Sequence, residues 1–108
     1  MKLVIIESPF AGDVDANIEY ARRAVKHSLS LGEAPIASHL LYTQDGILDD
    51  NIPHERQQGI DAGLAWRTVA HASVVYTDRG ISEGMEYGIA AAREAGLPVE
   101  YRSIATSR

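Results

Sequence analysis

Residues 73–95 read SVVYTDRGISEGMEYGIAAAREA, and this stretch decides the fold of the chain. The apolar run Ser73–Tyr76 predicts a buried strand, and the alanine-rich run Ile89–Ala95 predicts a helix. The glycines of GMEYG allow a ligand to approach the backbone closely. Because open parallel sheets bind ligands at the carboxyl ends of their strands, we expect a ligand site between this strand and this helix. Glu86 is its first candidate for chemistry.

The rest of the chain repeats the alternation of strand and helix. Apolar runs predict further strands at Leu3–Ile6, Pro35–Ser38 and Val99–Tyr101, and helices are expected over residues 18–29 and from Pro53 to about Ala72. The segment between residues 43 and 52 is expected to be an excursion over the surface. The order β-α-β-α-β-α-β predicts a single small α/β domain over residues 1–108. We expect it to be Rossmann-like or flavodoxin-like, with a parallel sheet of about four to five strands and helices on both faces.

Composition excludes several classes of function. The 108 residues contain no cysteine, so disulfides, thiolate metal sites and a cysteine nucleophile are excluded. A net charge of −5 without a cluster of Lys or Arg argues against a nucleic-acid polymer as partner, but leaves a single nucleotide open. The apolar runs are too short for a membrane span or a signal peptide, so we expect a cytoplasmic protein. Neither metal-ligand spacing nor a P-loop or dinucleotide fingerprint is present, so we expect no metal and no cofactor.

Three short segments carry a family resemblance. They are Ile5–Gly12 (IIESPFAG), Ile52–Arg56 (IPHER) and Gly84–Gly88 (GMEYG), the last of which is followed by Gly96–Val99 (GLPV). Together they resemble the nucleoside 2-deoxyribosyltransferase superfamily, including its nucleoside 5′-monophosphate N-glycosidase branch.

The resemblance implies an activity and its partners. It implies cleavage of the N-glycosidic bond of a (deoxy)nucleoside or its 5′-monophosphate through a glutamate nucleophile, by hydrolysis or by base transfer. The His-Glu-Arg element favours hydrolysis. Because the family commonly builds its sites at subunit interfaces, it also implies a homodimer or a higher homo-oligomer. The alternative function is a non-catalytic protein of the same fold that binds or sequesters a nucleotide.

The resemblance assigns catalytic roles to three carboxylates. Glu86 matches the nucleophile, and its alternative is a solvated helix carboxylate. Asp78 matches an acidic residue that holds the sugar hydroxyls, and its alternative is a loop aspartate that caps the next turn. Asp61 is the candidate acid that assists the leaving base. The family's aspartate aligns nearer Leu64 or Ala65, and a surface helix aspartate explains Asp61 as well.

A second set of residues is expected to bind the substrate. These candidates are Ser8, Pro9, Phe10, Gly12, His39, Arg56, Ser82 and Gly84. Ser8 either contacts the sugar or phosphate or is a turn serine. Ser82 either caps the helix that follows or faces a 5′-phosphate. His39 either contacts the base or acts as a local cap. Arg56 either pairs with a phosphate or with Asp78, or belongs only to the first turn of its helix.

Glu7 departs from the family pattern, which has a small residue at this position. A carboxylate at the mouth of the first strand repels a phosphate unless Arg56 or Arg79 neutralises it. Glu7 therefore favours a free nucleoside, or a contact with a sugar hydroxyl. The first-strand tyrosine that orients the nucleophile in the family is absent, and Tyr42 and Tyr87 are the candidates to replace it.

Overall fold

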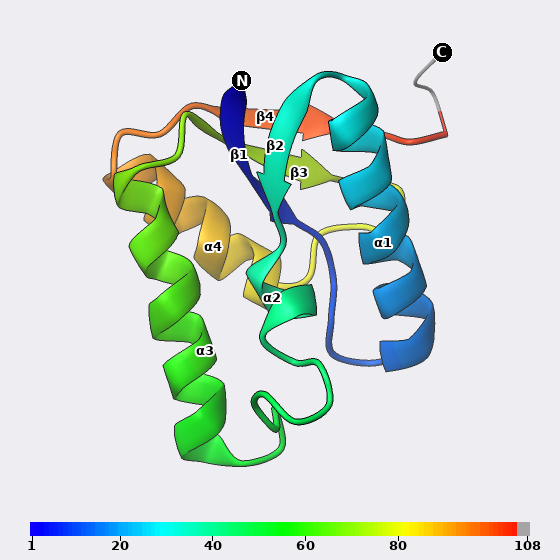
Figure 1. The fold of residues 1–108 in the computed structure, drawn as a ribbon, viewed down its shortest axis with the longest axis vertical. Coiled ribbons are helices and arrows are strands. Elements are labelled where there is room, and N and C mark those ends of the chain that lie inside the picture. Colours follow the sequence, from blue (N-terminus) through cyan, green and yellow to red (C-terminus); the bar gives the residue numbers. More distant parts are fainter. Residues whose placement is uncertain (106–108) are drawn as a thin grey trace.

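A four-stranded parallel sheet lies at the centre of the computed structural model, which describes residues 1–105 (Figure 1). The strands are β1 (Lys2–Glu7), β2 (Glu33–Ile36), β3 (Ala72–Tyr76) and β4 (Val99–Arg102), in the order β2-β1-β3-β4. All neighbouring strands pair in parallel. The predicted α/β class and parallel sheet are confirmed, and the last three residues of the predicted domain 1–108 lie outside the described part of the chain.

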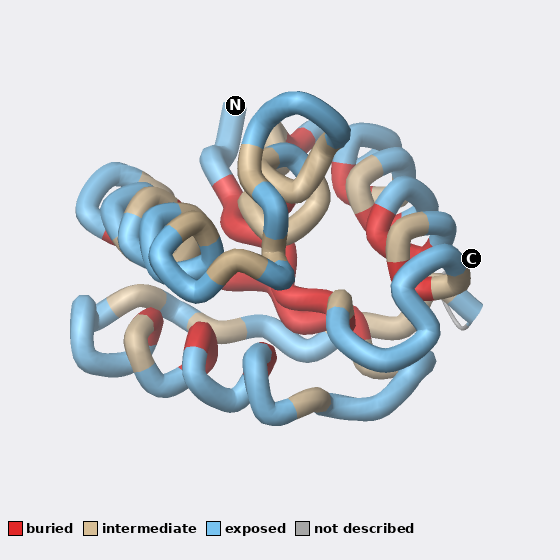
Figure 2. Tube along the Cα trace, turned by 90° about the horizontal axis from the view of Figure 1, so that it is seen from below, coloured by how far each residue is buried: buried red, intermediate tan, exposed pale blue. Residues whose placement is uncertain are grey.

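Helices cover both faces of this sheet, as predicted. They are α1 (Val14–Ser30), α2 (Ser38–Leu41), α3 (Pro53–Ala65), the 3₁₀ helix η1 (Trp66–Thr68) and α4 (Glu83–Glu94). On one face Tyr20 and Ala24 of α1 pack against β1 and β3, and on the other Met85 and Ile89 of α4 pack against Val75. Figure 2 shows that the buried positions gather in the sheet between these helices. No helix within residues 1–105 is long and apolar enough to cross a membrane.

Two predicted element boundaries were wrong. The second strand covers Glu33–Ile36 rather than Pro35–Ser38, so His39 lies in the short helix α2 and not at a strand end. The helix that begins at Pro53 ends at Ala65, and the chain continues as η1 only to Thr68. The hydroxyl of Thr68 donates to the Ala65 carbonyl at 2.9 Å, which offers that carbonyl a partner other than the next helical N–H.

An ion pair joins the two edge strands, β2 and β4. Glu33 is 7% exposed, and its Oε1 and Oε2 accept from Nη1 and Nη2 of Arg102 at 2.7 and 2.6 Å. Ser28 of α1 also donates to Oε1 of Glu33 at 2.7 Å. The hydrogen bonds from Arg102 lower the pKa of Glu33 below its ordinary value, although burial acts in the opposite direction. This pair fixes the last strand to the beginning of the second.

Candidate functional site

A cleft of about 710 Å³ opens at the carboxyl end of the sheet. Its walls are built by the segments that follow β1, β2 and β3 and by one side of α3, which is where α/β sheets bind ligands. Its ionisable and hydroxyl side chains include Glu7, Ser8, His39, Arg56, Arg67 and Ser82. Within residues 1–105, no group of three or more His, Asp or Glu side chains is placed to hold a metal ion.

Most of the predicted substrate-binding residues come together in this cleft. Those on its walls are Ser8, Phe10, His39, Arg56, Ser82 and Gly84. Pro9 and Gly12, in the same loop after β1, are not among the lining residues. Arg56 lies 3.9 Å from Asp50 and does not pair with Asp78. Ser82 caps α4, because its Oγ accepts from the Met85 amide at 3.3 Å.

The predicted catalytic carboxylates do not line the cleft. Glu86 is exposed on α4, between Met85 and Tyr87, which do line it. Asp61 is exposed on α3, and its Oδ1 accepts from the side-chain amide of Gln57 at 2.9 Å. The structure therefore does not bring Glu86, Asp61 and Asp78 together at one point.

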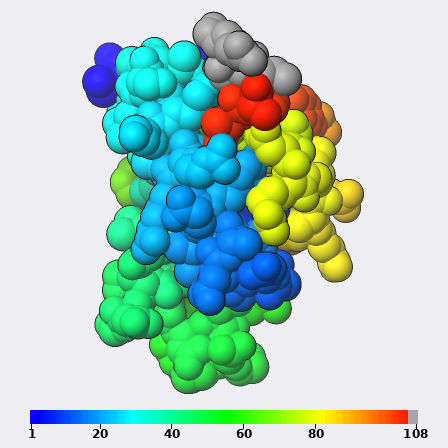
Figure 3. Space-filling view, turned by 90° about the vertical axis from the view of Figure 1, so that its right-hand side faces the viewer, coloured from blue at the N-terminus to red at the C-terminus, as the bar shows by residue number. Residues whose placement is uncertain are grey.

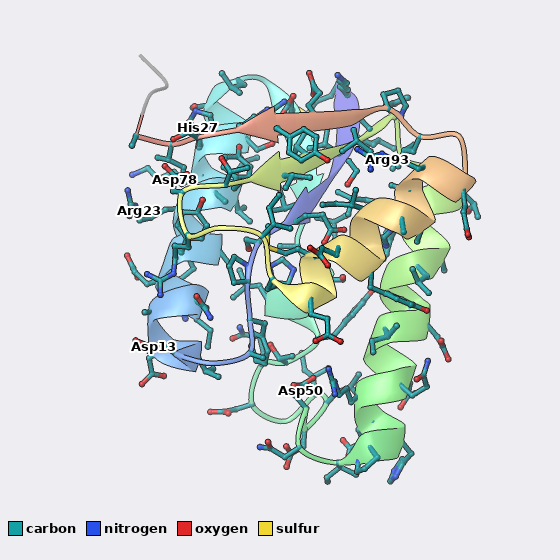
Figure 4. The ribbon with its side chains drawn as sticks, turned by 180° about the vertical axis from the view of Figure 1, so that it is seen from behind. Asp13, Arg23, His27, Asp50, Asp78 and Arg93 are labelled. Atoms are coloured by element: carbon teal, nitrogen blue, oxygen red, sulfur yellow. The ribbon has the colours of Figure 1, made fainter. Side chains whose placement is uncertain are left out.

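Asp78 instead holds the end of the described chain to α1. Its carboxylate accepts from the Tyr20 hydroxyl and the Ser103 hydroxyl, each at 2.6 Å, and from the amides of Ile104 and Ala105 at 3.0 and 3.1 Å. Partial burial acts to raise the pKa of Asp78, but these hydrogen bonds together hold it well below its ordinary value. Figure 4 shows Asp78 on the α1 side of the sheet, far from Asp50 in the wall of the cleft.

A smaller hollow of about 390 Å³ lies beside Asp78, on the α1 surface. It is lined by Arg23 of α1, by Arg79 and by Ala105, among others. Figure 3 shows this surface, where α1 in blue lies beside the segment after β3 in yellow. Nε of Arg79 donates to the side-chain oxygen of Asn17 at 2.9 Å, so Arg79 ties the same segment to α1.

A serine–histidine contact forms part of the cleft wall. Ser8 is 5% exposed, and its Oγ lies 2.6 Å from Nε2 of His39. Burial lowers the pKa of His39 to about 4, so the imidazole is neutral at pH 7. A neutral imidazole is able either to donate to a ligand or to accept from one, depending on its tautomer.

Sequence reasoning missed the partner of Glu7, which is Arg67. Glu7 is 8% exposed and Arg67 is 9% exposed, and Nη2 of Arg67 lies 2.5 Å from Oε2 of Glu7. Nη1 of Arg67 also donates to the Gly63 carbonyl at 2.8 Å. Burial raises the pKa of Glu7 to about 7, while the positive charge of Arg67 acts in the opposite direction. The expected neutralising arginines, Arg56 and Arg79, bind elsewhere.

Two glycines allow the helices to approach this cluster closely. A Cβ at Gly88 of α4 would lie 2.7 Å from Oε1 of Glu7, a distance that real Cβ atoms do not adopt. A Cβ at Gly63 of α3 would lie 2.6 Å from the hydroxyl oxygen of Ser38. The Glu7 carboxylate therefore rests directly against the backbone of α4.

Comparison with known proteins gives a family and a fold. Among solved structures, a 2-deoxyribosyltransferase from the psychrotolerant bacterium Bacillus psychrosaccharolyticus, described as a biocatalyst for nucleoside synthesis, is similar with a TM-score of 0.73 and 16% identity. The alignment covers 98% of this chain and 75% of that one, and at this identity it shows a shared fold alone. No curated protein matches the chain significantly. A family model matches residues 2–102, and the chain therefore belongs to the family described as Domain of unknown function (DUF7768).

Proposed function

We propose that this protein cleaves the N-glycosidic bond of a nucleoside or a nucleoside 5′-monophosphate, by hydrolysis or by transfer of the sugar to a second base. The cleft is the observation that carries the proposal. Polar side chains from the ends of β1, β2 and β3 converge there, in a fold shared with a 2-deoxyribosyltransferase. Its volume of about 710 Å³ lies within the range of roughly 300–1,000 Å³ that is typical of small-molecule sites.

The reaction needs a carboxylate at the anomeric carbon and a proton for the leaving base. A carboxylate attacks C1′ through an oxocarbenium-like transition state, and water or a second base then takes the sugar. The resemblance assigns the attack to Glu86, the assistance to Asp61 and the contact with the sugar hydroxyls to Asp78. These roles stay predictions; Met85 and Tyr87, which flank Glu86, line the cleft, whereas Glu86 itself does not.

A binding protein without catalysis is the second candidate. A specific observation favours it: none of the three carboxylates predicted to be catalytic is among the residues that line the cleft. Ser8, His39 and Ser82 would then bind a nucleoside or nucleotide that the protein senses or sequesters. Such a protein would bind its ligand and never release a free base.

One assay separates these functions. The purified protein is incubated with a panel of ribo- and deoxyribonucleosides and their 5′-monophosphates, with and without a second base, and free bases and new nucleosides are followed by chromatography. Release of base from one member establishes a glycosidase, and formation of a new nucleoside establishes transfer. Binding by titration calorimetry without any release of base supports the sensor and contradicts the enzyme.

A further inference from the structure

The cleft contains one carboxylate that is buried rather than solvated. The other acidic residues on its walls are Asp50, Glu55 and Glu83, which are partly or fully exposed, whereas Glu7 is 8% exposed. Glu7 ends β1 and points to the sheet face that carries α4, as shown by its contact with Gly88. A desolvated carboxylate at the floor of a concave site is a strong candidate for chemistry.

The two oxygens of this carboxylate have different surroundings. Arg67 holds Oε2 at 2.5 Å and is itself fixed by the Gly63 carbonyl. Oε1 makes no hydrogen bond with any residue that the structure describes. Unlike Nε of Arg67, it is not completely buried. One oxygen is therefore fixed in orientation while the other is free to bond to a ligand.

Arg67 is not arranged for stability alone. Its Nε is buried and has no hydrogen-bond partner within residues 1–105. A buried donor without a partner lowers stability, and such groups in native structures call for a functional explanation. Here Nη2 of the guanidinium donates to Glu7, while Nε remains without a hydrogen-bond acceptor. This is expected of a group that orients a reactive side chain.

The absence of a side chain at position 88 completes the arrangement. A Cβ at Gly88 would lie 2.7 Å from Oε1 of Glu7, so a side chain at this position would require the Glu7 carboxylate to shift. The carboxylate of β1 thus fills the space into which α4 would otherwise direct a side chain of its own. Glu86, two residues earlier on α4, is exposed and outside the lining.

We propose that Glu7, and not Glu86, is the carboxylate that attacks C1′ of the nucleoside, with Arg67 as its positioning residue. This inference rests on the proposed glycosidic function and names the group that performs it.

The reaction has two balanced steps. In the first, a lone pair of Oε1 forms a bond to C1′ while the C1′–N bond breaks, and its electron pair stays on the base, which takes a proton from water. In the second, water attacks C1′, the C1′–O bond to Glu7 breaks with its electron pair returning to the carboxylate, and the proton of the attacking water neutralises the hydroxide left by the first step. The sum is nucleoside plus water giving free base plus sugar.

Covalent trapping in the wild-type protein tests this directly. The protein is incubated with 2′-fluoroarabinonucleosides, whose fluorine slows both steps, and the adduct is located by tryptic digestion and mass spectrometry. Glu7 falls in the peptide Leu3–Arg22 and Glu86 in the peptide Gly80–Arg93. We expect the sugar adduct on Leu3–Arg22, with fragmentation placing it on Glu7.

Four variants provide the kinetic arm, and one of them, Glu86→Gln, tests the alternative nucleophile. Glu7→Gln is expected to lower kcat by at least about 1,000-fold. Glu7→Asp keeps the negative charge beside Arg67 and serves as the second variant if Glu7→Gln folds poorly. We expect it to lower kcat by about 100-fold, because the shorter side chain withdraws the attacking oxygen by about 1 Å. Glu94→Gln, an exposed carboxylate on α4 outside the cleft, is the matched control and should keep full activity.

The pH profile separates a reacting group from a structural one. Because burial raises the pKa of Glu7 to about 7, kcat/KM of the wild type should rise with pH through about 7 as the carboxylate ionises. An adduct on Gly80–Arg93, or activity lost in Glu86→Gln but kept in Glu7→Gln, would overturn the assignment and leave the proposed function standing. No base release from any nucleoside by the wild type would overturn both.

Discussion

The Glu7 side chain is almost fully buried, and its pKa therefore differs between the folded protein and the unfolded chain. Burial raises its pKa from 4.5 to about 7 in the folded protein, so the folded state holds the proton more tightly than the unfolded chain does. The stability linked to this proton is fully present below pH 4.5 and is lost as the pH rises to about 7.

This linkage gives a prediction for the stability of the protein. The free energy of unfolding of the wild type, relative to that of Glu7→Gln, should fall by up to about 3 kcal/mol across this interval, since one pKa unit corresponds to about 1.4 kcal/mol. Urea denaturation in steps from pH 4 to pH 8 measures the difference. Glu94 is exposed on α4, and Glu94→Gln is the control. The unfolding free energy of the wild type relative to this variant should not fall over the same pH range. If the difference in unfolding free energy between the wild type and Glu7→Gln does not change from pH 4 to pH 8, Arg67 keeps Glu7 ionised throughout this range.

At single residues, the sequence predicts which segments meet at the cleft, but not the long-range contacts of its charged side chains. Ser8, His39 and Ser82 were expected at the ends of strands or at a helix start, and those positions share one edge in any parallel sheet. The role of Arg67 could not be predicted, because its partner Glu7 lies 60 residues away in sequence. The partners of Asp78 were equally hidden, since Tyr20 precedes it by 58 residues. Periodicity carries information about neighbours along the chain and none about such distant contacts.

At the scale of elements, the position of α4 against β1 depends on Gly88 and not on Gly84. Gly88 faces the Glu7 carboxylate with no room for a Cβ, whereas the nearest atom to a Cβ at Gly84 is the Ser82 hydroxyl oxygen at 4.0 Å. Helix propensity alone would favour alanine at either position by about 1 kcal/mol. The close approach of α4 to β1 therefore reverses the ordinary preference at Gly88 only.

We expect these two positions to respond in opposite directions. Gly84→Ala should leave the free energy of unfolding unchanged or raise it by up to about 1 kcal/mol. Gly88→Ala should lower it by about 1–3 kcal/mol, because the added methyl group pushes on a carboxylate that Arg67 holds in place. Urea denaturation compares the pair. Equal effects at the two positions would show that Glu7 moves aside freely.

Element order could be predicted and element ends could not. The strands and the helices α1 and α4 follow from apolar runs and helical spacing, which depend on burial of one face, whereas α3 follows from Pro53 at its first turn. At the end of α3 the Thr68 hydroxyl bonds to the Ala65 carbonyl and Arg67 turns inward to Glu7, and no apolar periodicity reports such contacts. The short helix α2 has no side-chain cap, so no capping residue marks it in the sequence.

At the scale of the whole molecule, the ion pair between Glu33 and Arg102 connects the opposite edges of the sheet. Arg102→Gln should lower the free energy of unfolding by about 2–4 kcal/mol, because Glu33 would remain buried without its cation. Arg93→Gln is the matched control, since among residues 1–105 this exposed arginine bonds only to the exposed Tyr101 hydroxyl and should change stability by less than about 0.5 kcal/mol. Similar losses for both variants in thermal or urea unfolding would argue against a special role for the pair.

Assembly is also a property of the whole molecule, and the predicted homodimer or higher homo-oligomer stays a prediction. Large apolar side chains are exposed near the amino end of the sheet, among them Leu3, Leu31 and Val69. Sedimentation equilibrium of the purified protein would measure the oligomeric state directly.

The ion pair across the sheet also bears on how the protein emerges from the ribosome. Glu33 is synthesised 69 residues before Arg102, and the chain is made from its amino end. Until Arg102 has left the exit tunnel, a nascent chain that closed β1, β2 and β3 into a sheet would bury an uncompensated carboxylate. We therefore expect folding to wait for the last strand rather than to proceed stepwise during synthesis, and arrested nascent chains that end before residue 102 to remain sensitive to protease.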